Sequence, residues 1–178
     1  MIHTIGHGNR SLEEFIGLLR EAGILNLVDV RAYPASRRHP HFSQEPLGQS
    51  LAEAGVRYVW EGQALGGRRR PGRDSPHLAL RNPAFRAYAD HMATVEFRQA
   101  LDRLVEIASG RSTAIMCAER LPWQCHRYLV SDSIVARGLP VRHIVSPGKT
   151  LDHTLSRLAR RDNERLIYDV EAQPRLAI

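Results

Sequence analysis

The chain has 178 residues, 43% of them hydrophobic and 25% charged, which is typical of one globular domain with a substantial core. No apolar run approaches the length of a membrane span, and the N-terminus lacks the basic and apolar regions of a signal peptide. Two cysteines are too few for a disulfide scaffold and are typical of a reducing compartment. We therefore expect a cytoplasmic protein that makes no membrane contact.

The formal net charge is +6, and nearly all of the positive charge is arginine, because Lys149 is the only lysine. Arginine forks bind phosphate and carboxylate, so the charge favours an anionic partner, either a small molecule or a nucleic acid. Basic residues gather at 37–39, 68–73 and 157–161. The last group has helical spacing and is typical of a solvated helix face.

Apolar runs and helix signals alternate along the chain. Strands are expected at residues 2–6, 25–31, 56–60, 112–117 and 140–145, and helices at 11–23, 45–54, 83–92, 94–109 and 124–137. Ser11 and Glu14 form a capping box at the start of the first helix. Residues 62–83 are expected to form an irregular loop or lid, and the tail from Leu151 to contain a short helix.

The alternation of strands and helices predicts the fold class. It indicates a single α/β domain over residues 1–178, with a mostly parallel sheet and helices on both faces. The core is expected within about residues 1–145, and residues 146–178 form a C-terminal extension.

Polar and ionisable side chains follow several of the predicted strands. The carboxyl ends of parallel strands meet at one edge of a sheet, where α/β proteins bind their ligands. A single such residue is commonly a helix cap, but groups after three strands predict a shared polar pocket. Its expected members are His7, Asn9, Arg10, Asp29, Arg31, Cys117, Glu119 and Arg127.

Cys117 is a candidate nucleophile, because His126 and nearby arginines favour its thiolate. The alternative is a buried strand-end cysteine that packs as a small hydrophobic side chain. Asp29 and Glu119 are candidate acid-base groups, and a carboxylate beside arginines favours a base or electrostatic role. His7 and His126 would assist them.

A metal site is a further alternative, with Cys117, Glu119, Cys125, His126 and His7 as possible ligands. Thiolate and imidazole ligands suit zinc or iron. However, the spacing of the cysteines is not a standard one, and two adjacent residues rarely bind the same ion. The sequence therefore assigns no metal ligand and no cofactor.

The loop at residues 34–42 offers a hydroxyl, guanidinium groups and an aromatic ring, from Ser36, Arg37 and Phe42. This mixture suits phosphate contact combined with stacking on a base or sugar. The alternative is an exposed polar loop that is merely basic. Neither a Walker motif nor a dinucleotide fingerprint is present, since Gly6-His7-Gly8 lacks the further glycine.

Several of these stretches together resemble the bacterial domain of unknown function 488 family. The matching elements are Thr4–Ser11, Asp29–Arg31 with Pro34 and Ser36-Arg37, Phe42, Tyr58, Leu65–Gly67, and Cys117–Glu119 through Cys125–Arg127. They occur in the order of the family and span residues 4 to about 144. The resemblance implies an α/β fold with a polar pocket on one edge, and it implies no particular reaction.

The leading hypothesis is an enzyme, a hydrolase or transferase, that acts on an anionic, phosphate-bearing substrate such as a nucleotide or damaged nucleic acid. Arg31, Arg37 and Arg127 would hold the anion. One alternative is a module that binds a nucleotide or nucleic acid without turnover. The other is a metal-binding protein that uses its Cys, His and Glu side chains.

Overall fold

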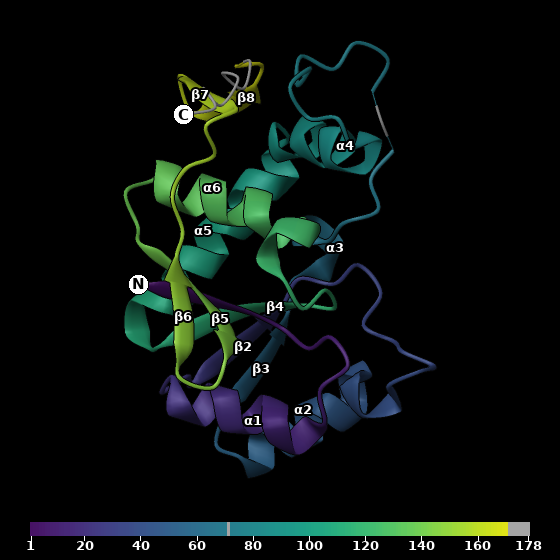
Figure 1. Cartoon of the computed structure of the whole chain (residues 1–178), viewed down its shortest axis with the longest axis vertical. Coiled ribbons are helices and arrows are strands. Elements are labelled where there is room, and N and C mark those ends of the chain that lie inside the picture. The colour runs from purple at the N-terminus through teal and green to yellow at the C-terminus, as the bar shows by residue number, and fades with distance from the viewer. Residues whose placement is uncertain (71, 171–178) are drawn as a thin grey trace, which may run out of the picture.

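The computed structural model describes residues 1–70 and 72–170, and these fold into one α/β domain (Figure 1). The main sheet has six strands in the order β3-β2-β4-β1-β5-β6. Its strands are β1 (Ile2–Gly6), β2 (Asn26–Asp29), β3 (Arg57–Trp60), β4 (Thr113–Cys117), β5 (Val141–Ser146) and β6 (Lys149–Asp152). The first five run parallel, and β6 pairs with β5 antiparallel. The predicted α/β class and mostly parallel sheet are confirmed.

Helices cover both faces of the sheet, as predicted (Figure 1). The α-helices are α1 (Leu12–Glu21), α2 (Gln44–Glu53), α3 (Gly62–Leu65), α4 (Pro83–Met92), α5 (Val95–Gly110) and α6 (Arg127–Ala136). One hydrophobic core lies under α1 and α2, and the other lies under α3 to α6. The central strands β1, β2 and β4 contribute to both cores, which explains their nearly continuous apolar sequences.

Local signals in the sequence set the helix starts. The Ser11 hydroxyl accepts a hydrogen bond from the backbone of Glu14 at 3.1 Å, which caps α1 as predicted. Thr94 caps α5 in the same way through the backbone of Phe97 at 3.2 Å. The helix expected from residue 124 begins later, at Arg127, because the short 3-10 turn η2 (Pro122–Gln124) comes first.

Between Leu151 and residue 170, the described part of the tail forms strands and no helix, so the short helix expected there is corrected. β6 extends the main sheet past the predicted core boundary, and Gly148 makes its turn with a φ of 66°. The strands β7 (Ala159–Asp162) and β8 (Arg165–Tyr168) then form a separate hairpin. Asn163 turns this hairpin with a φ of 54°, a conformation that asparagine tolerates.

The region 62–83 is only partly irregular. Its first residues form α3, and the side chain of Arg69 donates hydrogen bonds to the carbonyls of Gly66, Gln63 and Ala64. The expectation of a loop from residue 62 is therefore corrected to a short helix with a tethered loop behind it.

Candidate functional site

The candidate site lies where loops from several strands converge at the carboxyl edge of the sheet. The loop after β1 is tied to the loop after β4, since the backbone of His7 donates to Cys117 at 3.0 Å and that of Gly8 to Ala118 at 2.8 Å. The loop after β2 reaches the same place, because Phe42 stacks on the ring of His7 with centroids 4.3 Å apart. The loop after α3 joins them at Gly67, beside His126.

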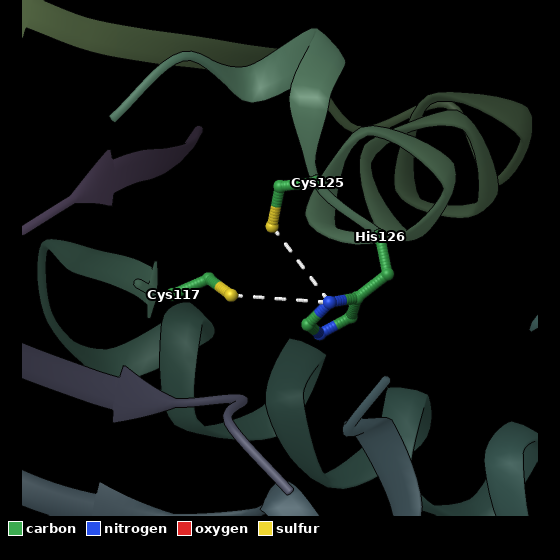
Figure 2. A group of neighbouring side chains, drawn as sticks. All are labelled: Cys117, Cys125 and His126. Atoms are coloured by element: carbon green, nitrogen blue, oxygen red, sulfur yellow. Dashed lines mark hydrogen bonds between the residues drawn. The ribbon is translucent and has the colours of Figure 1, made fainter. Parts of the chain in front are cut away.

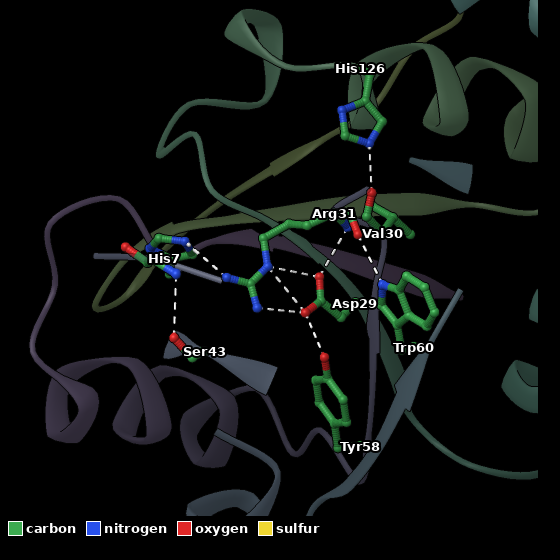
Figure 3. A network of polar contacts seen from close by, with 9 residues as sticks. His7, Asp29, Val30, Arg31, Ser43, Tyr58, Trp60 and His126 are labelled. Carbon is green, nitrogen blue, oxygen red and sulfur yellow. Dashed lines mark hydrogen bonds and ion pairs between the residues drawn. The ribbon is translucent and has the colours of Figure 1, made fainter. Parts of the chain in front are cut away.

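Asp29 organises the first of two polar groups at this edge (Figure 3). Its carboxylate is fully buried and accepts from Arg31 Nε at 2.9 Å and from Arg31 Nη2 at 2.6 Å. The hydroxyl of Tyr58, on β3, donates to the same carboxylate at 2.7 Å. A buried charge is tolerated only when it is paired and hydrogen-bonded, and here both conditions are met.

This pairing shifts the ionisation of both partners of Asp29. Burial lowers the pKa of the Arg31 guanidinium, but the hydrogen bonds and charge of Asp29 outweigh it, so the pKa is raised. Burial and then the charge of Asp29 raise the pKa of Tyr58. Arg31 is therefore a fixed cation, and Tyr58 remains a neutral donor.

His7 lies against the free side of Arg31. Its Nδ1 donates to the carbonyl of Gly8 at 2.9 Å, which leaves Nε2 to accept from Arg31 Nη1 at 3.5 Å. Burial, followed by the charge of Arg31, lowers the pKa of His7 to about 4. The imidazole is therefore neutral at pH 7, and its protonation at that pH is unfavourable.

The second polar group consists of Cys117, Cys125 and His126 (Figure 2). Cys117 ends β4, Cys125 follows η2, and His126 directly precedes α6. The Nδ1 atom of His126 lies 3.8 Å from the sulfur of Cys117 and 3.7 Å from that of Cys125. Both cysteines are buried free thiols.

The opposite nitrogen of His126 fixes the orientation of the ring. Nε2 donates to the carbonyl of Val30 at 2.9 Å (Figure 3). In the neutral ring, Nδ1 therefore carries a lone pair, and this atom faces the two sulfurs (Figure 2). The hydrogen bond from Cys125 lowers the pKa of Cys117 well below its ordinary value, against the effect of burial. Burial raises the pKa of Cys125. The arrangement suits both a thiol–imidazole pair and a set of metal ligands.

Arg127, one of the arginines predicted to hold an anion, and Arg10, a predicted member of the pocket, lie inside the protein. Arg127 is 1% exposed and donates to the carbonyls of Ile5 at 2.8 Å and Arg120 at 2.9 Å. Arg10 is 2% exposed and donates to the carbonyls of Gly6 and Val145. In this structure both hold backbone segments together, and anion contact by either stays a prediction.

Other predicted binding residues divide between the interior and the surface. Phe42 is fully buried against His7, and the Ser36 hydroxyl accepts from the backbone of His39 at 2.9 Å. Asn9, Arg37 and Glu119 are exposed. The predicted residues therefore meet at one edge of the sheet, but the groups at its centre are closed off, with Cys117 6% exposed.

Exposed side chains also lie on the loops after β2, α3 and β4 that build this edge. The guanidinium of Arg68 lies 5.6 Å from the ring centre of Tyr33, which is 69% exposed, so the pair links the loops after α3 and β2. Trp123, in η2, is 50% exposed. The exposed rim consists of Tyr33, Arg37, Arg38, Arg68, Arg120 and Trp123.

Several of these residues were not predicted from the sequence to belong to the site. Tyr58 was noted only as part of a family motif, and its position in alternation on a strand gave no sign that it faces Asp29. Tyr33 and Trp123 each stand next to a proline, a pattern of exposed turns that could have marked them as rim residues. A cavity of about 680 Å³ lies elsewhere, between α5, α6 and the β7–β8 hairpin, and contains none of the predicted site residues.

The geometry defines an α/β protein with a polar centre at the carboxyl edge of a parallel sheet, the place where such sheets bind ligands. The chain belongs to the family described as Domain of unknown function DUF488, whose model matches residues 11–134. The predicted family is thereby confirmed. No curated protein and no solved structure matches the chain. Among the described residues, no helix is long and apolar enough to cross a membrane.

Proposed function

We propose that this protein is an enzyme that acts on an anionic, phosphate-bearing substrate, a nucleotide or a damaged nucleic acid, at the carboxyl edge of its sheet. One observation carries the proposal: exposed arginines and aromatic rings lie on the same loops that enclose a buried thiol–imidazole cluster. The rim supplies contacts for phosphate and base, and the cluster supplies groups that can react.

The rim provides substrate binding. Arg37, Arg38 and Arg68 are exposed and can contact phosphate oxygens, because guanidinium forks match their geometry. Tyr33 and Trp123 present exposed rings on which bases stack, a contact that tolerates any base. Basic side chains interleaved with aromatic rings are typical of surfaces that bind single-stranded nucleic acid or nucleotides.

The buried centre provides the chemistry. The reaction takes place at Cys117 and His126, with the cation of Arg31 close enough to affect developing negative charge. Both oxygens of Asp29 already accept hydrogen bonds, so this carboxylate positions Arg31. Glu119 follows Cys117 by two residues and is exposed, so we assign proton transfer to this carboxylate.

A module that binds without turnover is the second candidate, favoured by the closure of the centre around Cys117. Product analysis separates the two. The protein is incubated with nucleotides and with short oligonucleotides carrying damaged bases, and the products are separated by chromatography and mass spectrometry. Wild type and Arg160→Ala, a control on β7 whose arginine pairs with Asp169, are expected to form product, whereas Cys117→Ser is expected to form none. Binding without product in every protein would support the binding module and contradict the enzyme.

A further inference from the structure

We infer that Cys117, Cys125 and His126 bind one Zn²⁺ ion, with its fourth coordination position left to water or to a substrate atom. The inference deepens the proposed function at the same cluster, because Cys117 and His126, where the reaction is proposed to occur, would hold the ion as ligands. Zinc binding itself is measured without that reaction. It rests on the placement of three donor atoms, on their surroundings, and on the hydrogen bond that orients the histidine.

The first argument is the distance between the donor atoms. The ligand atoms of the three residues all lie within 4.8 Å of one another. The distance from His126 Nδ1 to the sulfur of Cys117 is 3.8 Å, and the distance to that of Cys125 is 3.7 Å. A tetrahedral zinc ion with ordinary bond lengths gives a sulfur-to-nitrogen edge of roughly 3.6 Å, so little movement is required.

The second argument is the orientation of the imidazole. A histidine that binds a metal commonly donates its other ring nitrogen to a carbonyl or carboxylate, which fixes the tautomer and aims the lone pair. His126 does this through Nε2 and the carbonyl of Val30 at 2.9 Å. Adjacent residues rarely bind the same ion, but here the backbone changes direction between them. Cys125 is extended and His126 is helical, so both side chains can face one ion.

The net charge of the bound ion with its ligands, and the room beside His126 Nδ1, also suit zinc. Two thiolates and one Zn²⁺ ion form a neutral unit, so the buried group carries no net charge that would be costly in the interior. The residue beside the imidazole is Gly67, where a side-chain Cβ would lie 3.0 Å from Nδ1. Glycine therefore leaves room next to the donor atom.

The number of ligands indicates the kind of zinc site. Structural sites bind zinc with four protein ligands, whereas catalytic sites use three and keep one position open. The soft and borderline donors of this cluster favour zinc over magnesium or calcium, which prefer oxygen. Among the described residues, these three form the group whose donor atoms converge in this way.

The test measures metal binding by the untagged, full-length protein in the absence of substrate. Protein stripped by a chelator is titrated with Zn²⁺ against a chromophoric competitor, and separately with Co²⁺, whose spectrum reports thiolate coordination. Wild type is expected to bind one ion per chain and to give a thiolate-to-cobalt charge-transfer band. Cys117→Ser, Cys125→Ser and His126→Gln are each expected to weaken zinc binding at least about 100-fold.

His39→Gln is the matched control, since His39 lies in the loop after β2 and is expected to leave zinc affinity unchanged. Circular dichroism checks that each variant is folded. If a variant does not fold, the cobalt spectrum of the wild type still decides the matter. Failure of the wild type to bind zinc at micromolar concentration would overturn the inference, as would a cobalt spectrum without thiolate bands or full affinity in both cysteine variants. Because no substrate is present, the outcome is independent of nucleotide binding.

Discussion

At the scale of the residue, Asp29 sets the arrangement of the polar centre. A buried carboxylate must be paired, and Arg31, just after β2, and Tyr58, on β3, provide its partners. Removing one member of such a group leaves an unpaired buried charge. The loss of folding free energy then exceeds the net stabilisation that the intact pair provides. The guanidinium of Arg31 is thereby held in one position beside His7, where it can influence a bound anion.

Tyr58→Phe isolates one contact of this centre. The substitution keeps the ring and removes the hydroxyl that donates to Asp29 at 2.7 Å. We expect the free energy of unfolding to fall by about 1.5–3 kcal/mol, the range for a hydrogen bond to a charged group. Tyr33→Phe, at a position 69% exposed, is expected to change it by less than about 0.5 kcal/mol. Urea denaturation measures both, and equal effects would mean that the Tyr58 hydroxyl does not support the carboxylate.

At the scale of the element, the close approach of the loops after β1 and β4 brings His7 next to Cys117. Gly6 permits this approach, because a Cβ at this position would lie 1.8 Å from the backbone oxygen of Glu119. The sequence therefore needs glycine at the end of the first strand to build the site.

Gly6→Ala is expected to lower the free energy of unfolding by more than about 2 kcal/mol, since backbone atoms must move to admit the methyl group. Gly17→Ala is the matched control, in the middle of α1 with no atom within 4 Å of the added Cβ. It is expected to stabilise the protein by about 0.5–1 kcal/mol through helix propensity. Thermal denaturation compares the two, and a Gly6→Ala variant as stable as wild type would show that the loops do not meet as described.

The success of sequence analysis also varies by element. Apolar runs and alternation predicted the parallel strands, and the capping box at Ser11 predicted the start of the first helix, because these are local signals. The β7–β8 hairpin was missed, since Arg157, Arg160 and Arg161 imitate a helix face and Asn163 was not recognised as a turn residue. Strand order predicted that the loops after β1 and β4 meet at one edge, but the partners of Arg10 and Arg127 depend on tertiary contacts that no local pattern carries.

At the scale of the whole molecule, a buried chain of hydrogen bonds joins the sheet to the C-terminal segment. His153 donates to Asp132 at 2.9 Å and accepts from His143 at 2.9 Å, and His143 accepts from Thr4 at 2.7 Å. Tyr168, at the end of β8, donates to the other oxygen of Asp132 at 2.9 Å. The chain thereby ties β1, β5 and α6 to residues that follow the main sheet.

Because of these buried hydrogen bonds, we expect the free energy of unfolding to fall in acid. Burial, followed by the charges of His153 and Arg127, lowers the pKa of His143 from 6.5 to about 3. Between these values the unfolded state binds more protons, so stability falls as the pH drops from about 6.5 toward 3 and levels off below that. The contribution of His143 is on the order of 5 kcal/mol, at about 1.4 kcal/mol for each pKa unit.

His143→Gln cannot titrate, so its free energy of unfolding is expected to depend less steeply on pH between about 6.5 and 3 than that of wild type. Denaturant titrations across this pH range measure the slopes. Identical slopes for His143→Gln and wild type would contradict the assignment.

The central claim, that a phosphate-bearing ligand binds the exposed rim at the carboxyl edge, is tested most directly by calorimetric titration with nucleotides and short oligonucleotides at several salt concentrations. Arg37→Ala and Arg68→Ala are each expected to weaken oligonucleotide binding across all sequences and to reduce the salt slope by about 1. Arg160→Ala, whose arginine pairs with Asp169 at 2.9 Å on the β7–β8 hairpin, is expected to change neither quantity. Equal losses in Arg37→Ala and Arg160→Ala, both vanishing at high salt, would mean that only diffuse charge attracts the ligand and would contradict the account.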